Sequence, residues 1–472
     1  MRVLPVLLAV ALLIAPATAG FAVAGASPAT GADDRPAILT ERSPDAVDPL
    51  REEGPNRGAD AVLVDASTVR QTGTEDGTDG NGTTENGSDA PATDTWINVL
   101  SAPSDSATSV SIGHHRADLG PASRIETART TASMRTEAAI AHVRAANSSG
   151  ERQRRLVAAE AEVRDAEARL YERQRAAIDA HARGELSDRE LFIELAEISA
   201  TADALRTRLD VLAALAAETS GTSLETDSLA FRLSVYDGPV RSYALETLRA
   251  GESPDRIYVE TREDVAVLAA IDADDGEYLR EVYRGDRWDR DAAGDADESE
   301  RALERTLAAY PRVDDRSLSA DTLGTDGLTR VNVPFEGGRL RTFVSGGDGD
   351  VFIEHQRRDL ASFSDSHRRS TTQDGIEVTV DATYPGGPVR VTAMDVESGE
   401  PVSNATITVA AGDDDSVEVG STNAEGRLWI LSPDRPYRTT VVDDPRVAWV
   451  SEVTPVTPPR IPPPESGNED ES

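Results

Sequence analysis

The chain has 472 residues, of which 85 are acidic and 48 are basic, so its formal net charge at pH 7 is -37. Such a charge repels the phosphate backbone of nucleic acids, which argues against a DNA- or RNA-binding protein. The sequence contains no cysteine, which excludes disulfide bonds, thiol catalysis, cysteine-ligated zinc and a lipid-modified N-terminal cysteine.

All of the basic residues are arginine, and aromatic residues make up only 4% of the chain. In salt at 1 M the screening length falls to about 3 Å, so a dense acidic surface stays hydrated while its charges repel one another weakly. The composition therefore resembles that of proteins from extreme halophiles. The alternative is an ordinary acidic protein.

Residues 1–26 have the pattern of an export signal. An apolar segment, residues 3–14, follows Arg2, and Pro16 and the small residues Ala17-Thr18-Ala19 come after it. We expect a cleaved signal peptide; the alternative is a retained membrane anchor, since the uncharged stretch could also span about 30 Å of hydrocarbon. Both place the rest of the chain outside the cytoplasm, as a secreted or cell-surface protein, with membrane contact only if the segment is retained.

Residues 27–95 are predicted to be a disordered acidic linker. Residues 71–94 contain six acidic residues and no basic ones, and they hold too few apolar side chains to offset the chain entropy lost on folding. Candidate N-glycosylation sites in the whole chain are Asn81, Asn86, Asn147 and Asn404.

Residues 96–220 are predicted to be a helical hairpin or coiled-coil domain. Ser187 and Glu190 have the spacing of a capping box, which marks a helix start. Apolar residues before and after this start recur at steps of three and four, which predicts two antiparallel helices. Residues 121–147 are expected to add a third helix. The two apolar seams are Leu156, Ala159, Val163, Ala166 and Leu170, and Leu191, Leu195, Ile198, Ala202, Leu205, Leu209, Leu212 and Ala216.

The predicted helices are nearly neutral. Residues 121–218 contain 15 arginines and 17 acidic residues, which leaves a net charge of -35 for the rest of the chain. One interpretation is that Arg–Glu pairs stabilise exposed helices. The other is that this surface meets another protein or a second copy of the chain.

Residues 221–365 are predicted to be an α+β domain, with a weak internal duplication as one alternative. Helices are expected at 239–250 and 299–310, and each is followed by a set of β-like runs. Residues 328–358, LTRVNVPFEGGRLRTFVSGGDGDVFIEHQRR, resemble the PepSY domains of exported proteins in their helix-plus-hairpin plan and their Gly/Asp turn.

Residues 374–453 contain seven short β-like runs between turn residues, which predicts an Ig-like β-sandwich. Residues 454–472 form a proline-rich acidic tail. The sandwich resembles the carboxypeptidase-regulatory, transthyretin-like family, a resemblance that implies a fold but no activity. It rests on Gly399, Pro401, Val402, Ala405, Val409, Thr422, Gly426 and Arg427.

The whole chain is therefore predicted to be a multidomain α+β protein: an antiparallel helical hairpin, one or two small α+β units and a β-sandwich. The segment order and the passages WINVLSAPSD, GELSDRELFIELAEI, RIYVETREDVAVLAAID and TYPGGPVRVTAMD resemble a family of exported haloarchaeal proteins. The resemblance covers residues 96–453 and implies no activity.

No catalytic or cofactor-binding residue is predicted, because the usual nucleophile-elbow, zinc-helix and phosphate-loop motifs do not occur. The metal candidate is a calcium loop, in which oxygens at alternate residues would wrap one cation around Gly294. The alternative is a solvated acidic turn. The candidate ligands are Asp289, Asp291, Asp297 and Glu300. Glu160 and Glu162 could in principle act as a general acid/base pair, but we interpret them as part of a solvated helix face.

These observations predict a non-enzymatic cell-surface structural or interaction protein, which acts through the helical hairpin and the β-sandwich. Its expected partner is another protein or a second copy, bound by the helical region. One alternative is a chaperone or inhibitor of exported peptidases, which would require residues 328–358 to form a sheet packed on the preceding helix. Another is a secreted hydrolase, which would require a deep pocket around His355 or a pair of carboxylates.

Overall fold

A computed structural model describes residues 97–103, 109–113, 119–250, 257–294, 297–325, 327–347, 349–363 and 367–461. The predicted signal segment, the acidic linker and most of the C-terminal tail lie outside the described residues. Within them the chain is a multidomain α+β protein, with helices first and antiparallel sheets after them. None of the described helices is both long enough and apolar enough to span a membrane.

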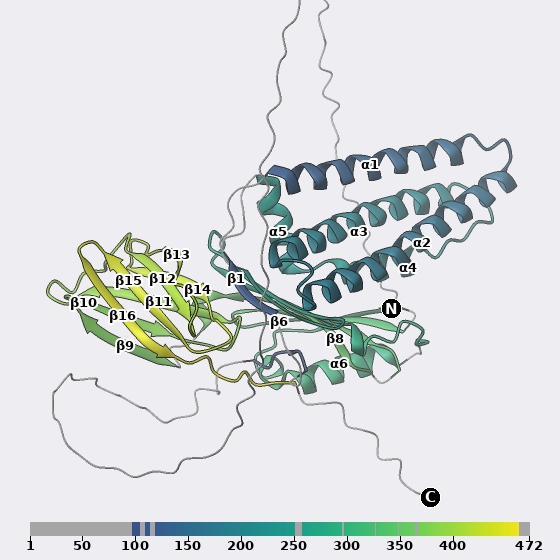
Figure 1. The fold of residues 1–472 in the computed structure, drawn as a ribbon. Helices are drawn as coiled ribbons and strands as arrows, with labels where there is room; N and C mark the ends of the chain where they lie inside the picture. Colours follow the sequence, from purple (N-terminus) through teal and green to yellow (C-terminus); the bar gives the residue numbers. More distant parts are fainter. Residues whose placement is uncertain are drawn as a thin grey trace, which may run out of the picture. The chain divides into compact units, whose positions relative to one another are not determined.

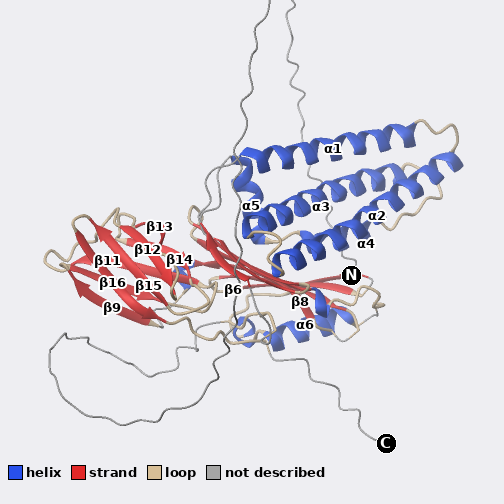
Figure 2. Ribbon diagram, in the orientation of Figure 1, coloured by secondary structure: helices blue, strands red, loops and turns tan. Residues whose placement is uncertain are grey.

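Of the described helices, five lie on one face of a large sheet, and two others pack against its other face (Figures 1 and 2). The first group is α1 (Leu119–Arg144), α2 (Ser149–Ala182), α3 (Asp188–Ala217), α4 (Thr226–Leu233) and α5 (Pro239–Ala250). The second is α6 (Glu298–Ala309) and α7 (Pro311–Asp314). The three predicted long helices are all present, and α2 and α3 form the predicted hairpin.

The apolar seams account for the hairpin. Every seam residue of α3 is buried except Leu205, which is half-buried, and every seam residue of α2 is buried except Ala166. Ser187 caps α3, and its Oγ accepts from the backbone N–H of Glu190 at 3.3 Å while the Glu190 carboxylate accepts from the N–H of Ser187 at 2.9 Å. The capping box is therefore confirmed. Supercoiling of the pair stays a prediction.

The sheet has eight antiparallel strands in the order β1-β2-β3-β4-β8-β7-β6-β5. The meander β2-β3-β4 follows a helix, as predicted, whereas a strand that was not predicted, β5, lies between the helices and the meander β6-β7-β8. β4 pairs with β8, so the two halves form one sheet with a core on each face. The strands are β1 (Ser109–Gly113), β2 (Ile257–Arg262), β3 (Val265–Asp272), β4 (Glu277–Arg284), β5 (Asp321–Thr325), β6 (Leu328–Phe335), β7 (Gly338–Ser345) and β8 (Val351–Asp359).

The predicted start of the helical domain at residue 96 is wrong. Residues 109–113 form β1, which pairs with β2, and the segment before it also joins the sheet domain. There the backbone N–H of Leu100 donates to the buried carboxylate of Glu354 at 2.6 Å. A buried carboxylate must be satisfied, and this segment supplies one of its donors.

The C-terminal domain is a sandwich of two four-stranded sheets, β14-β11-β10-β9 and β13-β12-β15-β16. It begins at Arg368 rather than at residue 374, because β9, with the sequence RRSTTQ, has no apolar residue by which it could be recognised. The strands are β9 (Arg368–Gln373), β10 (Ile376–Asp381), β11 (Pro388–Asp395), β12 (Thr406–Ala411), β13 (Val417–Ser421), β14 (Arg427–Leu431), β15 (Tyr437–Asp443) and β16 (Arg446–Val453).

Candidate functional site

A row of buried polar side chains runs along α2, one at every seventh residue. Heptad spacing keeps them on one side of the helix, next to the apolar row, and this side faces the sheet domain rather than solvent. The interpretation of Glu160 as a solvated residue was therefore wrong, whereas Glu162 is 67% exposed and pairs with Arg208. The polar row is Glu160, Glu167, Gln174 and His181.

Each member of the polar row has a partner far along the chain. Glu167 accepts from the Tyr236 hydroxyl at 3.0 Å and from Arg290 at 2.8 Å. Gln174 accepts from Arg241 of α5 at 2.6 Å. Burial makes each unpaired polar group costly, so these bonds fix the position of α2 against α5 and against the loop that contains Arg290.

Arg241 continues this network into the sheet. Its guanidinium forms an ion pair with Glu281 of β4, and both side chains are 3% exposed. The Glu281 carboxylate lies against the backbone at Gly238, where a Cβ would come within 1.9 Å of it, so only glycine fits there. Because Glu281 also accepts from the N–H of Arg241 at 3.4 Å, it neutralises the positive end of α5.

Beside this helix end, on the same face of the sheet, lies a cavity of about 610 Å³ that we call the basic pocket. Arg339 lies opposite Arg357 on the neighbouring strand, and Arg341 lies opposite His355, so these four side chains share one face. The lining is Asp237, Gly238, Pro239, Ser242, Glu277, Leu318, Pro334, Phe335, Gly338, Arg339, Arg341, His355 and Arg357.

The electrostatics of the basic pocket favour anions. The pKa of Arg341 is lowered by burial and by the charges of Arg330, Arg339 and Arg357, against the opposing effect of Asp237. The pKa of His355 is lowered well below its usual value by burial and then by nearby arginines, so its imidazole is neutral at neutral pH. His355 is 5% exposed, and its Nδ1 has no hydrogen-bond partner among the described residues.

The basic pocket also contains a serine and an aspartate, but they do not form a catalytic relay. The Ser242 hydroxyl donates to Asp237 at 3.3 Å. In a serine hydrolase, histidine bridges the serine and the acid, whereas no described hydrogen bond joins His355 to either residue. A cavity that includes His355, which the hydrolase alternative required, is present.

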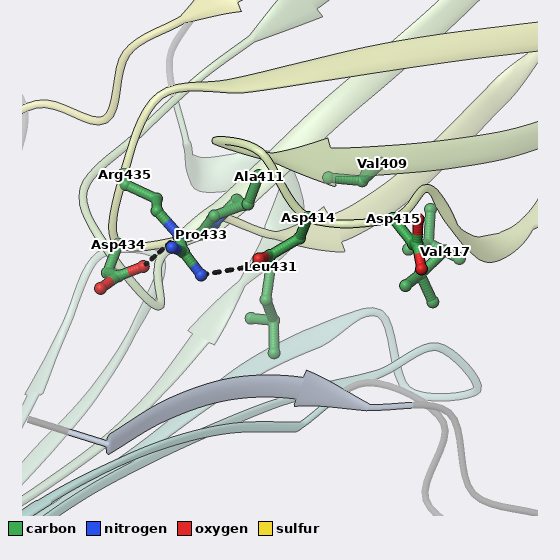
Figure 3. A pocket seen from close by; sticks show the side chains of 10 residues that line it. Val409, Ala411, Asp414, Asp415, Val417, Leu431, Pro433, Asp434 and Arg435 are labelled. Carbon is green, nitrogen blue, oxygen red and sulfur yellow. Dashed lines mark hydrogen bonds and ion pairs between the residues drawn. The ribbon is translucent and has the colours of Figure 1, made fainter. Parts of the chain in front are cut away.

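A second cavity, of about 280 Å³, lies in the β-sandwich (Figure 3). Its cation, Arg435, already pairs with Asp414 at 2.6 Å and with Asp434 at 3.8 Å. The remaining walls are mostly apolar. Because Arg435 is already paired with two acids, this cavity is a weaker candidate for binding a charged ligand than the basic pocket is.

The predicted calcium ligands do not gather. Asp289 accepts from the N–H of Asp291 at 3.0 Å, Asp297 precedes α6, and Glu300 is in its first turn. Among the residues that the structure describes, no three metal-ligating side chains of His, Cys, Asp or Glu lie together. Arg290, inside the loop, binds Glu167 instead, which orients this segment toward α2.

Two glycosylation candidates are described, and both are exposed. Asn147 lies in the loop between α1 and α2, and Asn404 lies in the turn before β12 with a φ of 59°. Asn81 and Asn86 lie outside the described residues. Use of these sites stays a prediction.

Three family models match consecutive parts of the chain. Residues 1–254 match a domain of unknown function, DUF7096, and residues 257–364 match a family of unknown function, DUF7094. Residues 367–449 match an archaeal fibronectin-III type-like domain, which places the sandwich in that class rather than in the carboxypeptidase-regulatory family its turns resemble. No curated protein and no solved structure matches the chain.

Proposed function

The chain belongs to the DUF7096 family, and from this premise we propose that it is an exported, non-catalytic cell-surface protein of a halophile that acts by binding another protein through its helices. A fibronectin-III type-like sandwich that follows two domains of unknown function along the chain is consistent with an interaction or structural role. The predicted export signal and the acidic composition support the proposed cell-surface location.

The observation that carries the proposal is the outer surface of α1. This helix has 26 residues, yet among residues 122–144, whose burial is described, the buried apolar side chains are Ile125 and Val143, and Met134 is 68% exposed. It packs mainly against α3. A helix with so little buried area gains most of its stability from a partner on its free side.

Charge explains why this surface suits a partner. The helical region is nearly neutral in a chain of net charge -37, so another acidic protein of the same environment, including a second copy, meets least repulsion here. The inner side of α2 is occupied by the sheet domain, so the outer side of the bundle is the part that remains available.

The test is cross-linking of the tagged chain on intact cells at their growth salt, followed by mass spectrometry. We expect cross-links from residues 119–144 to one partner or to a second copy, and their loss in Met134→Glu. Val396→Glu is the matched control, because Val396 is 53% exposed on the sandwich. Cross-links that survive Met134→Glu, or a monomer with none, would reject the proposal.

Export is tested separately by sequencing the N-terminus of the mature chain and by protease treatment of intact cells. Export predicts that protease degrades the chain without lysis. Protection of the chain in intact cells would contradict it.

One observation favours a second candidate function, inhibition or chaperoning of exported peptidases. β6, β7 and β8 do form a sheet, and α6 before them packs on it. This is the condition that the PepSY-like resemblance required. Co-purification of a peptidase cross-linked to residues 328–358, instead of a partner on α1, would favour this function.

A further inference from the structure

We propose that the basic pocket binds a small ligand through a tetrahedral oxyanion, a sulfate or phosphate group, held by Arg339, Arg341 and Arg357 beside His355. This goes beyond the proposed function, which concerns a protein partner on the helices. No family match assigns a ligand to residues 257–364, where these four residues lie.

Three arginines lie close together on two neighbouring strands of the sheet. Arg339 and Arg341 are two positions apart on β7, and Arg357 lies across from Arg339 on β8. Like charges on facing positions of neighbouring strands repel one another. An arrangement that places three guanidinium groups on the wall of one cavity is therefore stabilised by an anion between them.

The basic pocket holds two acids, Asp237 and Glu277, against three arginines, so its positive charge is only partly neutralised. Glu277 pairs with Arg357 at 3.1 Å, and Asp237 accepts from Ser242 and lies 3.7 Å from Arg206. Arg341 donates to the neutral side chain of Asn332 at 2.9 Å. Arg339 is exposed and has no partner among the described residues.

His355 has a buried ring nitrogen without a hydrogen-bond partner among the described residues. A buried polar atom without a partner calls for an explanation, and a bound group is one such explanation. The nitrogen is Nδ1, in a side chain that lines the basic pocket. A neutral imidazole carries one donor, and a ligand oxygen can accept from it.

The chemistry of guanidinium selects the class of anion. Its planar fork of N–H donors matches pairs of oxygens on sulfate, phosphate or carboxylate. A monatomic anion such as chloride offers no such pair, so an oxyanion can compete with chloride at high salt. Three arginines around one group favour the doubly charged tetrahedral oxyanions over a carboxylate.

The size of the pocket indicates that the oxyanion is part of a larger molecule. Its volume of about 610 Å³ lies within the roughly 300–1,000 Å³ of small-molecule sites. Leu318, Pro334 and Phe335 add an apolar side to the lining. A sugar or another ring that carries a sulfate or phosphate ester would use both the cations and this apolar side.

The test is isothermal titration calorimetry of the full chain at the chloride concentration of growth. The probes are inorganic sulfate, inorganic phosphate, glucose 6-sulfate and glucose 6-phosphate. We expect saturable binding of at least one inorganic anion and tighter binding of its sugar ester. Binding of sulfate and glucose 6-sulfate would identify the ligand as a sulfate ester, and binding of phosphate and glucose 6-phosphate would identify it as a phosphate ester. Absence of saturable binding by all four would overturn the proposal, and equal affinity for ion and ester would overturn the inference of a larger ligand.

The variants separate this site from general salt effects, since sulfate and phosphate stabilise many proteins without binding to a site. Arg339→Gln removes an exposed side chain, so the fold should survive it, and it should weaken binding about tenfold or more. Arg369→Gln is the matched control, because Arg369 is exposed on β9 of the sandwich. Equal affinities in the two variants would overturn the proposal. Arg339→Gln should leave the α1 cross-links unchanged, so the two proposals can fail independently.

Discussion

Nη2 of Arg290 lies 2.8 Å from both carboxylate oxygens of Glu167, although the two residues are 123 positions apart. Arg290 also lies over the ring of Tyr171, with 4.0 Å between its guanidinium carbon and the ring centroid. The loop after η3 (Gly285–Arg287) is thereby attached to the middle of α2. This contact ties the helical bundle to the sheet domain.

Replacing Glu167 by alanine should strongly destabilise the protein. Glu167 is 3% exposed, and its loss leaves Arg290 and the Tyr236 hydroxyl without their shared acceptor. We expect a decrease of about 3 kcal/mol in the free energy of unfolding, measured by urea denaturation at constant salt. Glu162→Ala, on the exposed side of the same helix, should cost under about 1 kcal/mol. Similar losses in the two variants would show that the buried row contributes no more than a surface pair.

The cap of α3 gives a second prediction. Ser187→Ala removes the oxygen that accepts from the Glu190 N–H and breaks the capping box. We expect a loss of about 1 kcal/mol in the free energy of unfolding, and nearly full stability in Ser187→Thr, which keeps the hydroxyl. A threonine variant as unstable as the alanine variant would argue that another interaction fixes this helix start.

Gly386 gives a third prediction, at the contact between the sandwich and the large sheet. Its carbonyl accepts from the Tyr278 hydroxyl at 2.9 Å, its φ is +72°, and an added Cβ would lie 2.7 Å from the ring of Tyr258. Gly386→Ala therefore adds a clash to backbone strain, and we expect a loss of about 2–4 kcal/mol.

Gly399→Ala is the matched control for this effect. Gly399 has nearly the same φ, +70°, but nothing lies within 4 Å of an added Cβ. Strain alone predicts a loss of about 1 kcal/mol. If both alanine variants lost the same free energy in urea denaturation, the ring of Tyr258 would have to move at little cost.

The elements that could be predicted from sequence are those whose signal is local. Ser187 and Glu190 identified the start of α3, and the apolar steps identified its buried side. β9 was missed because an edge strand without apolar residues gives no periodic signal. The polar row of α2 was also missed. In the sequence Glu167 and Gln174 have the pattern of exposed helix residues, and their burial depends on partners that are distant in the chain.

The basic pocket was not predicted either, although part of its signal was present. Arg339 and Arg341 alternate along one β-like run, and His355 and Arg357 alternate along the next, so each pair could be assigned to one face of a strand. Their convergence depends on the register between β7 and β8. Hydrophobic patterning could not fix that register, because the pairing shifts at an irregularity between Phe343 and Val344.

Asp264 gives the last prediction, a stability change with pH. Burial, together with the charges of Asp179 and Asp286, raises the pKa of Asp264 from 3.8 to about 6, against the opposing effect of Arg175. The folded state therefore binds this proton more tightly than the unfolded state does. The stability it contributes is fully present below about pH 4 and is lost as the pH rises to about 6.

The variant Asp264→Asn isolates this effect. Asparagine tolerates the φ of 55° at this position, and it does not titrate. The free energy of unfolding of the natural chain relative to Asp264→Asn should therefore increase as the pH falls from 7 to 4, whatever the other carboxylates contribute to both proteins. Glu263→Gln, which removes the adjacent exposed carboxylate, is the control. The difference in the free energy of unfolding between the natural chain and Asp264→Asn could instead stay constant over this range. That result would show that the folded and unfolded states bind the Asp264 proton equally.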